Sequence, residues 1–103
     1  MANKITLTVQ HFEGCPNGPL MINNVKSIVS KYPEELEYRE QLIETNEDAA
    51  KHHFRGSPTL LIDGRDFENM FQPLNPSLTC RFYKNGVPTS EDIEDRIKKM
   101  LNH

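Results

Sequence analysis

The sequence lacks most of the motifs that mark a metal centre or a paired-thiol site. Only two of its 103 residues are cysteines, Cys15 and Cys80, which excludes the dense disulfide framework of small secreted domains. It contains no C-x-x-C pair, no H-x-x-x-H spacing and no glycine-rich phosphate loop. The adjacent His52 and His53 would diverge by about 100° on a helix, so they do not readily share one ion. We therefore expect neither a resident metal nor a cofactor.

Long apolar runs and an excess of positive charge are also missing. No apolar run is long enough for a signal peptide or a membrane-spanning helix. The formal net charge of -3 gives no electrostatic basis for binding nucleic acid or an anionic membrane. We expect a cytoplasmic protein with no nucleic-acid or membrane partner, and the sequence does not indicate its oligomeric state.

What the chain does contain is the alternation of strands and helices expected of one domain over residues 1–103. Apolar residues alternate or run together in the segments predicted to be strands, at 4–12, 36–43 and 59–63. Helical spacing of apolar residues predicts helices from Pro19 to Tyr32, where Pro33 ends the helix, at 45–54 and from Ser90 onward. Asp63-Gly64 is a hairpin signal, so residues 65–67 should pair back antiparallel, with Arg65 and Asp66 on a solvated edge.

Residues 68–89 are the segment with the least periodicity, and they hold three of the seven prolines. They are consistent with a short strand at 77–83 and a turn at 84–86. The complete order is strand, helix, strand, helix, strand, strand, helix. Two parallel strands joined by a helix, followed by a hairpin and a last helix, predict an α/β fold with a mixed four-stranded sheet flanked by helices.

This order resembles the thioredoxin-like superfamily and its βαβ-ββα arrangement. The segments that carry the resemblance are G-C-P-N-G-P-L from Gly14, R-G-S-P-T-L-L-I-D-G-R-D from Arg55, and S-L-T-C-R-F-Y from Ser77. They look most like small bacterial thioredoxin-like proteins, sometimes labelled as related to alkylmercury lyase. The sequence departs from that pattern at Gly18, where thioredoxins have their second active-site cysteine.

Cys15 is the first candidate for chemistry, because it stands between the first strand and the first helix. The unpaired N–H groups and the dipole of a helix N-terminus stabilise a thiolate, and the thiolate is the nucleophile in thiol–disulfide exchange. His11 lies two residues before the loop, either close enough to exchange a proton with Cys15 or simply as a strand residue. The alternative for Cys15 is a loop cysteine without a role.

Ser57, Pro58 and Thr59 are the second candidate, as substrate-binding residues. The resemblance implies that the Ser57-Pro58 bond is cis and that its loop lies beside Cys15. It also implies that the Ser57 backbone is free to hydrogen-bond an extended peptide or a glutathione moiety. Without the resemblance, Pro58 is interpreted as an ordinary trans proline that begins a strand.

Cys80 is the third candidate, because exchange on a single cysteine stops at a mixed disulfide unless a second thiol resolves it. Cys80 fits that role only if its segment folds back to bring the two Cα atoms within about 7 Å. The alternative is a core cysteine, because Leu78 and Phe82 fall on the same face of the short strand.

Three functions remain open at this point. The first is a thiol-redox protein in which Cys15 attacks a protein disulfide or a glutathione-type substrate, and Cys80 or glutathione resolves the intermediate. The second is a soft-metal binding protein with two thiolate ligands, since two thiolates suit linear Hg(II) or Cu(I). The third is a peptide-binding module that has lost its catalysis together with the second cysteine at Gly18.

Overall fold

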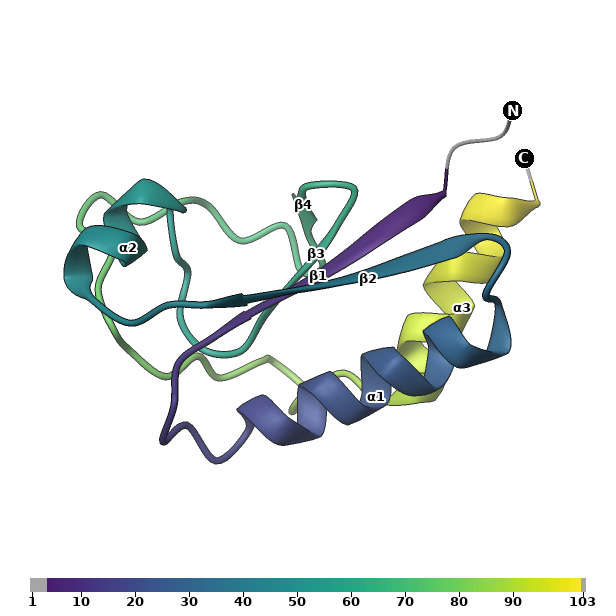
Figure 1. Cartoon of the computed structure of the whole chain (residues 1–103), viewed down its shortest axis with the longest axis horizontal. Coiled ribbons are helices and arrows are strands. Elements are labelled where there is room, and N and C mark those ends of the chain that lie inside the picture. Colours follow the sequence, from purple (N-terminus) through teal and green to yellow (C-terminus); the bar gives the residue numbers. More distant parts are fainter. Residues whose placement is uncertain (1–3, 103) are drawn as a thin grey trace.

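Four strands form one mixed sheet in the computed structural model, which describes residues 4–102 (Figure 1). The first three residues, part of the stretch from which no signal peptide was expected, lie outside that range. The strand order is β2-β1-β3-β4, with the bounds β1 Ile5–His11, β2 Leu36–Leu42, β3 Thr59–Ile62 and β4 Arg65–Asp66. β1 and β2 are parallel, whereas β3 runs antiparallel to both β1 and β4. The predicted mixed four-stranded sheet is confirmed.

Two helices cover one face of this sheet, side by side: α1 (Gly18–Lys31) and α3 (Ser90–Leu101) (Figure 1). Helical spacing gives each of them one apolar stripe, and alternation in β1 turns Leu7 and Val9 toward the same side. α3 begins with a full capping box between Thr89 and Asp92. The core between the helices and the sheet consists of Leu7, Val9, Met21, Val25, Ile28, Leu36, Leu60, Ile62, Tyr83, Ile93 and Ile97.

The helix α2 (Asn46–Lys51) is shorter than the predicted 45–54 and lies at one end of the sheet (Figure 1). The Thr45 hydroxyl accepts a hydrogen bond from the Asp48 N–H at 3.0 Å and caps the helix. The Asp48 carboxylate, however, accepts from the Glu44 N–H at 3.2 Å instead of closing a reciprocal box. The chain then leaves the helix through His53, whose φ of 51° is incompatible with further helix.

Residues 68–89 contain no regular strand, so the strand predicted at 77–83 is reduced to a single bridge between Ser57 and Cys80. The turn predicted at 84–86 is present. Leu78, Cys80 and Phe82 are all exposed, whereas Arg81 and Tyr83 are buried. The interpretation of Cys80 as a core residue is therefore wrong, because the alternate positions of this segment face inward.

Candidate functional site

Cys15 lies in the loop that connects β1 to α1, and only 4% of it is exposed. Gly14 adopts a φ of 93° immediately before it, a conformation that turns the chain sharply toward the helix. The Cys15 carbonyl accepts a hydrogen bond from the Gly18 N–H at 3.2 Å, so a tight turn leads into α1. The thiol itself points toward the Ser57 loop, where it donates to the Ser57 carbonyl oxygen at 3.4 Å.

The surroundings of Cys15 favour the thiolate. Burial raises the pKa of the Cys15 thiol, but hydrogen bonds from the Ser57 side chain, the Asn17 and Gly18 backbone and the Cys80 side chain lower it by more. The net result is a pKa below the ordinary value of a cysteine. The helix N-terminus therefore stabilises the anion as expected, with a second set of donors coming from residues far along the chain.

Ser57 is fully buried, and a cis peptide bond joins it to Pro58, as the resemblance implied. The Ser57 N–H donates to the Thr79 carbonyl at 2.8 Å, and the Ser57 carbonyl accepts from the Arg81 N–H at 2.8 Å. The expectation that these backbone groups are free for an extended peptide or glutathione is wrong, because residues 79–81 of the same chain occupy them. Ser57 contacts Cys15 through its side chain and through its carbonyl oxygen, which also accepts from the thiol.

Cys80 lies opposite Ser57 in this bridge, and its side chain reaches Cys15. Partial desolvation, the negative charge on Cys15 and the hydrogen bond between the two sulfurs raise the pKa of Cys80. The structure thus brings together two cysteines that lie far apart in the chain, one buried with a lowered pKa and the other exposed with a raised pKa. A neutral thiol beside a thiolate is the arrangement from which a disulfide forms on oxidation.

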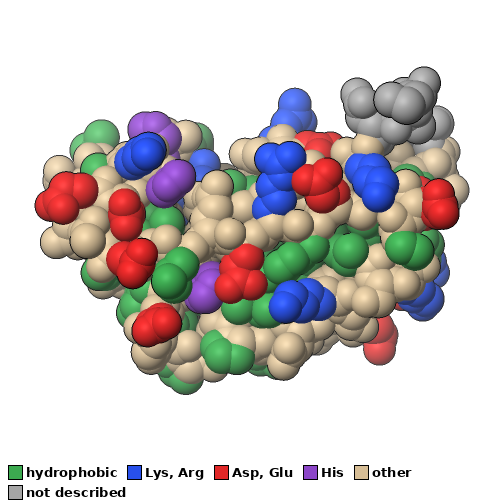
Figure 2. All heavy atoms as spheres, viewed as in Figure 1, with side chains coloured by type: hydrophobic (Ala, Val, Ile, Leu, Met, Phe, Trp, Pro, Cys, Tyr) green, Lys and Arg blue, Asp and Glu red, His purple; other side chains and the backbone are tan. Residues whose placement is uncertain are grey.

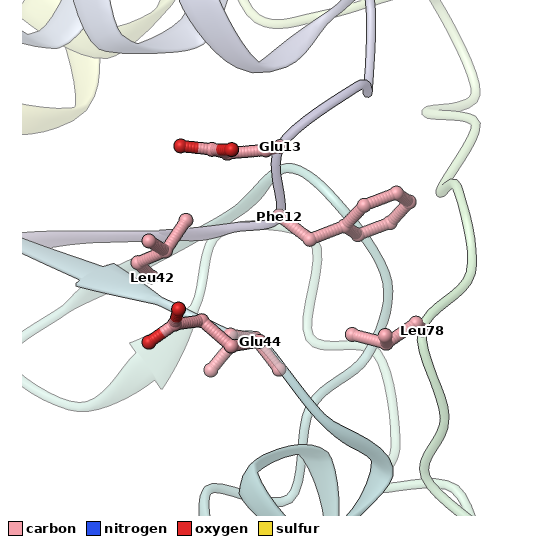
Figure 3. Close-up of a pocket in the computed structure, with 6 residues that line it drawn as sticks. Phe12, Glu13, Leu42, Glu44 and Leu78 are labelled. Carbon is pink, nitrogen blue, oxygen red and sulfur yellow. The ribbon is translucent and has the colours of Figure 1, made fainter.

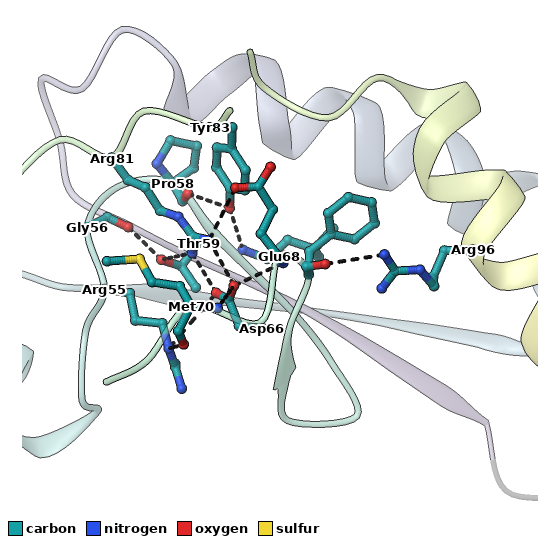
Figure 4. Close-up of polar contacts among 12 residues, drawn as sticks. Arg55, Gly56, Pro58, Thr59, Asp66, Glu68, Met70, Arg81, Tyr83 and Arg96 are labelled. Carbon is teal, nitrogen blue, oxygen red and sulfur yellow. Dashed lines mark hydrogen bonds and ion pairs between the residues drawn. The ribbon is translucent and has the colours of Figure 1, made fainter. Parts of the chain in front are cut away.

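The segment that carries Cys80 is fixed by a buried ion pair (Figure 4). The Arg81 guanidinium donates to both carboxylate oxygens of Asp66, at 2.5 and 2.8 Å, and the two side chains are 4% and 2% exposed. Asp66 also accepts from the backbone N–H groups of Glu68 and Met70. The prediction of a solvated edge at Asp66 is therefore wrong, because a bidentate arginine replaces the water that this carboxylate would otherwise need.

Hydrogen bonds on the inner side of the Ser57 loop involve Pro58 and Thr59, the other two residues predicted for substrate binding. Thr59 is fully buried, and its hydroxyl donates to the Gly56 carbonyl at 2.6 Å, so Thr59 supports the loop from behind (Figure 4). Burial raises the pKa of Tyr83 to about 12, which keeps its phenol protonated to donate to the Pro58 carbonyl at 2.9 Å. Arg81 and Tyr83 were not predicted as site residues, and the alternation between 78 and 83 was the one available signal for them.

Gly56 is required where the two segments meet. A Cβ built on Gly56 would lie 2.9 Å from the Arg81 Cβ, and its φ of +106° disfavours any other residue. The absence of a side chain therefore lets the Cys80 segment approach the Ser57 loop closely enough to form the bridge.

Gly18, by contrast, has room for a side chain. A Cβ there would lie 3.7 Å from the His11 Cβ, an ordinary van der Waals contact. His11 itself is paired through Nε2 with Glu40 at 2.9 Å. A hollow of about 400 Å³ opens in front of Cys15, and the residues that line it are His11, Phe12, Glu13, Gly14, Cys15, Pro19 and Ile22. Its size and mainly apolar walls give the buried sulfur a route to small reactants.

Comparison with models of known protein families and with curated proteins gave no match to this chain. Between residues 4 and 102, no three His, Cys, Asp or Glu side chains are grouped so that they could hold a metal ion. Within the same range, no helix combines the length and the apolar character needed to cross a bilayer. The chemistry of the site therefore depends on Cys15, Cys80 and the groups around them.

Proposed function

We propose that this protein is a thiol–disulfide exchange protein of thioredoxin-like fold, in which Cys15 attacks and Cys80 resolves. The observation that carries the proposal is the pairing of a buried, low-pKa thiol with a second thiol on a segment that two backbone hydrogen bonds hold beside it. The mixed four-stranded sheet and the position of Cys15 just before α1 support the choice of fold.

The reaction is a pair of sulfur displacements that balance without a metal or cofactor. The Cys15 thiolate attacks one sulfur of a substrate disulfide, forms a mixed disulfide with it and releases the other sulfur as a thiolate that solvent protonates. Cys80 then loses its proton and attacks Cys15 Sγ, which releases the second substrate thiolate. The substrate gains two electrons, and the protein is left with a Cys15–Cys80 disulfide.

The residues around the two cysteines stabilise the thiolate and hold the loop. The Ser57 side chain stabilises the Cys15 thiolate before attack, and Pro58 and Thr59 hold the loop in place. The substrate class is a protein disulfide or a small mixed disulfide, and a glutathione-type thiol returns the oxidised pair to the reduced state. A cytoplasmic location, where such thiols are abundant, fits this cycle.

The test uses the wild-type protein and the single variants Cys15→Ser and Cys80→Ser. We expect mild oxidation of the wild type to give an intramolecular Cys15–Cys80 link in peptide mass spectrometry. With oxidised glutathione, Cys80→Ser should accumulate a glutathione adduct on Cys15. Cys15→Ser is the matched control and should react more slowly at Cys80, because Cys80 lacks the Ser57, Asn17 and Gly18 hydrogen bonds that lower the pKa of Cys15. Adducts that form first on Cys80 would show that Cys80 attacks and Cys15 resolves. If neither cysteine reacts, a binding module without catalysis becomes the better interpretation.

A second candidate function, soft-metal binding, is favoured by the same contact between the two sulfurs. Two thiolates are enough for a linear Hg(II) or Cu(I) site. Titration of the reduced protein with Hg(II) distinguishes this candidate. It requires one ion per chain bound by both sulfurs, with loss of that stoichiometry in Cys15→Ser and in Cys80→Ser alike.

A further inference from the structure

The Ser57 edge is closed to an incoming polypeptide, because its N–H and carbonyl are bonded to Thr79 and Arg81. A peptide substrate that approaches Cys15 therefore cannot be held there by strand pairing. Recognition has to come from side-chain contacts on the surface around the two cysteines.

A second hollow, of about 190 Å³, adjoins the one that opens on Cys15 and shares two of its residues (Figure 3). We call it the Phe12–Leu78 hollow; its lining is Phe12, Glu13, Leu42, Ile43, Glu44 and Leu78. Its volume is below the range of about 300–1,000 Å³ usual for small-molecule sites. The hollow is large enough to accommodate one side chain of a larger partner.

The side chains of Phe12, Leu42, Ile43 and Leu78 give the Phe12–Leu78 hollow an apolar part, and Phe12 and Ile43 are held in place by packing. Ile43 is fully buried, whereas Leu42 and Leu78 are 40% and 37% exposed. The Phe12 ring packs edge-on against Phe54 with 6.5 Å between centroids, and Figure 3 shows it directed toward the chain segment that carries Leu78. Covering these exposed apolar surfaces with an apolar side chain would be favourable.

The rim of the same hollow is acidic. Glu13 and Glu44 are both exposed, and neither forms an ion pair with any residue between 4 and 102. Figure 2 shows acidic side chains gathered on the lower side of the end of the molecule that carries α2. A partner with a positive charge next to its apolar residue would be complementary to this rim.

The hollow also has the right position relative to the reacting sulfurs. Phe12 precedes Cys15 by three residues, and Leu78 precedes Cys80 by two. We propose that the Phe12–Leu78 hollow is a specificity subsite that binds a large apolar side chain adjacent to Lys or Arg, close to the reacting cysteine of a polypeptide disulfide. This inference rests on the proposed thiol–disulfide exchange at Cys15 and names its substrate class.

The experiment compares three substrates of the reduced wild-type protein under the same conditions. Two are short peptides of equal length carrying a mixed disulfide, identical except that one has Leu-Lys and the other Ser-Glu beside the cysteine. The third is a small aromatic disulfide without a peptide. We expect kcat/KM for the Leu-Lys peptide to exceed that for the Ser-Glu peptide by roughly tenfold or more, and the ratio to fall with added salt.

Variants of the hollow identify which residues cause the preference for the Leu-Lys peptide. The double variant Glu13→Gln/Glu44→Gln should reduce the Leu-Lys to Ser-Glu ratio roughly three- to tenfold, and Leu78→Ala should reduce it independently of salt. Glu34→Gln makes the same chemical change at an exposed carboxylate away from the hollow and should leave the ratio unchanged. Equal rates for both peptides alongside reaction of the small disulfide would overturn the subsite alone. No reaction with any of the three would overturn the proposed function, and the subsite with it.

Discussion

Replacing Asp66 by Asn should destabilise the protein far more than the same change at an exposed carboxylate. The change keeps the shape of the side chain but removes the charge that neutralises Arg81, whose side chain is 4% exposed. An amide nitrogen would also face one of the two guanidinium donors, because both Asp66 oxygens accept from Arg81. Removing one partner of a buried ion pair costs about 3–5 kcal/mol, which is a large part of a total stability of about 5–15 kcal/mol.

Urea unfolding followed by far-ultraviolet circular dichroism measures this loss. With a slope of about 1–3 kcal/mol per M, a loss of about 3–5 kcal/mol should lower the midpoint by roughly 1–5 M. Asp95→Asn, the same change at an exposed carboxylate, should alter the stability by no more than about 0.5 kcal/mol. Replacing both partners, as in Asp66→Leu/Arg81→Met, should recover part of the loss because no charge is left buried.

The pH dependence provides an independent check. Burial raises the pKa of Asp66, but Arg81 and the Met70 and Glu68 N–H groups lower it by more, so the net pKa is below the ordinary value. A depressed pKa stabilises the fold above the pKa of the unfolded chain, about 3.9, and that stabilisation is lost as the pH falls through the folded value. The difference between wild type and Asp66→Asn should therefore narrow below about pH 4. A loss under about 1 kcal/mol at neutral pH would refute the assignment of the ion pair as the anchor of the Cys80 segment.

Three further outcomes are expected. Ser57→Ala should move the midpoint for alkylation of Cys15 by iodoacetamide to higher pH, because the side chain stabilises the thiolate. Gly18→Cys should form a disulfide between Cys15 and the introduced thiol in peptide mass spectrometry, since a Cβ fits there and the turn keeps the two Cα atoms within about 7 Å. Thr89→Ala should cost about 0.5–2 kcal/mol in urea unfolding, because the capping box of α3 is lost.

Each of these outcomes has a matched control in the same chain. Ser27→Ala, on the exposed side of α1, should leave the alkylation midpoint of Cys15 in place, and an unmoved midpoint in Ser57→Ala itself would contradict the role of Ser57. Gly18→Ser tests the same added bulk without a thiol. Thr79→Ala removes an exposed threonine side chain, so a loss equal to that of Thr89→Ala would argue against the cap as the cause.

The local structure of this protein, and the position of Cys15 in it, can be predicted from the sequence. Alternation in β1, the apolar stripes of α1 and α3 and the Asp63-Gly64 turn depend on neighbours a few positions away, so they predicted the mixed sheet. The same holds for Cys15, because the start of a helix is a local feature and its N–H groups act on any thiol placed there.

Long-range contacts determine the part of the structure that local patterns do not predict, which is the placement of residues 78–83. In residues 78–83, either Leu78, Cys80 and Phe82 or Arg81 and Tyr83 could face inward. The choice depends on Asp66, the ion-pair partner of Arg81. Asp66 lies fifteen positions from Arg81, and no local pattern identifies it as the partner. That ion pair, with the space left by Gly56, places residues 79–81 on the Ser57 edge and Cys80 beside Cys15. The elements and the first cysteine of the site thus follow from local sequence. Whether Cys80 meets that cysteine follows only from the folded chain, because burial of one charged pair determines which face of an otherwise ambiguous segment points inward.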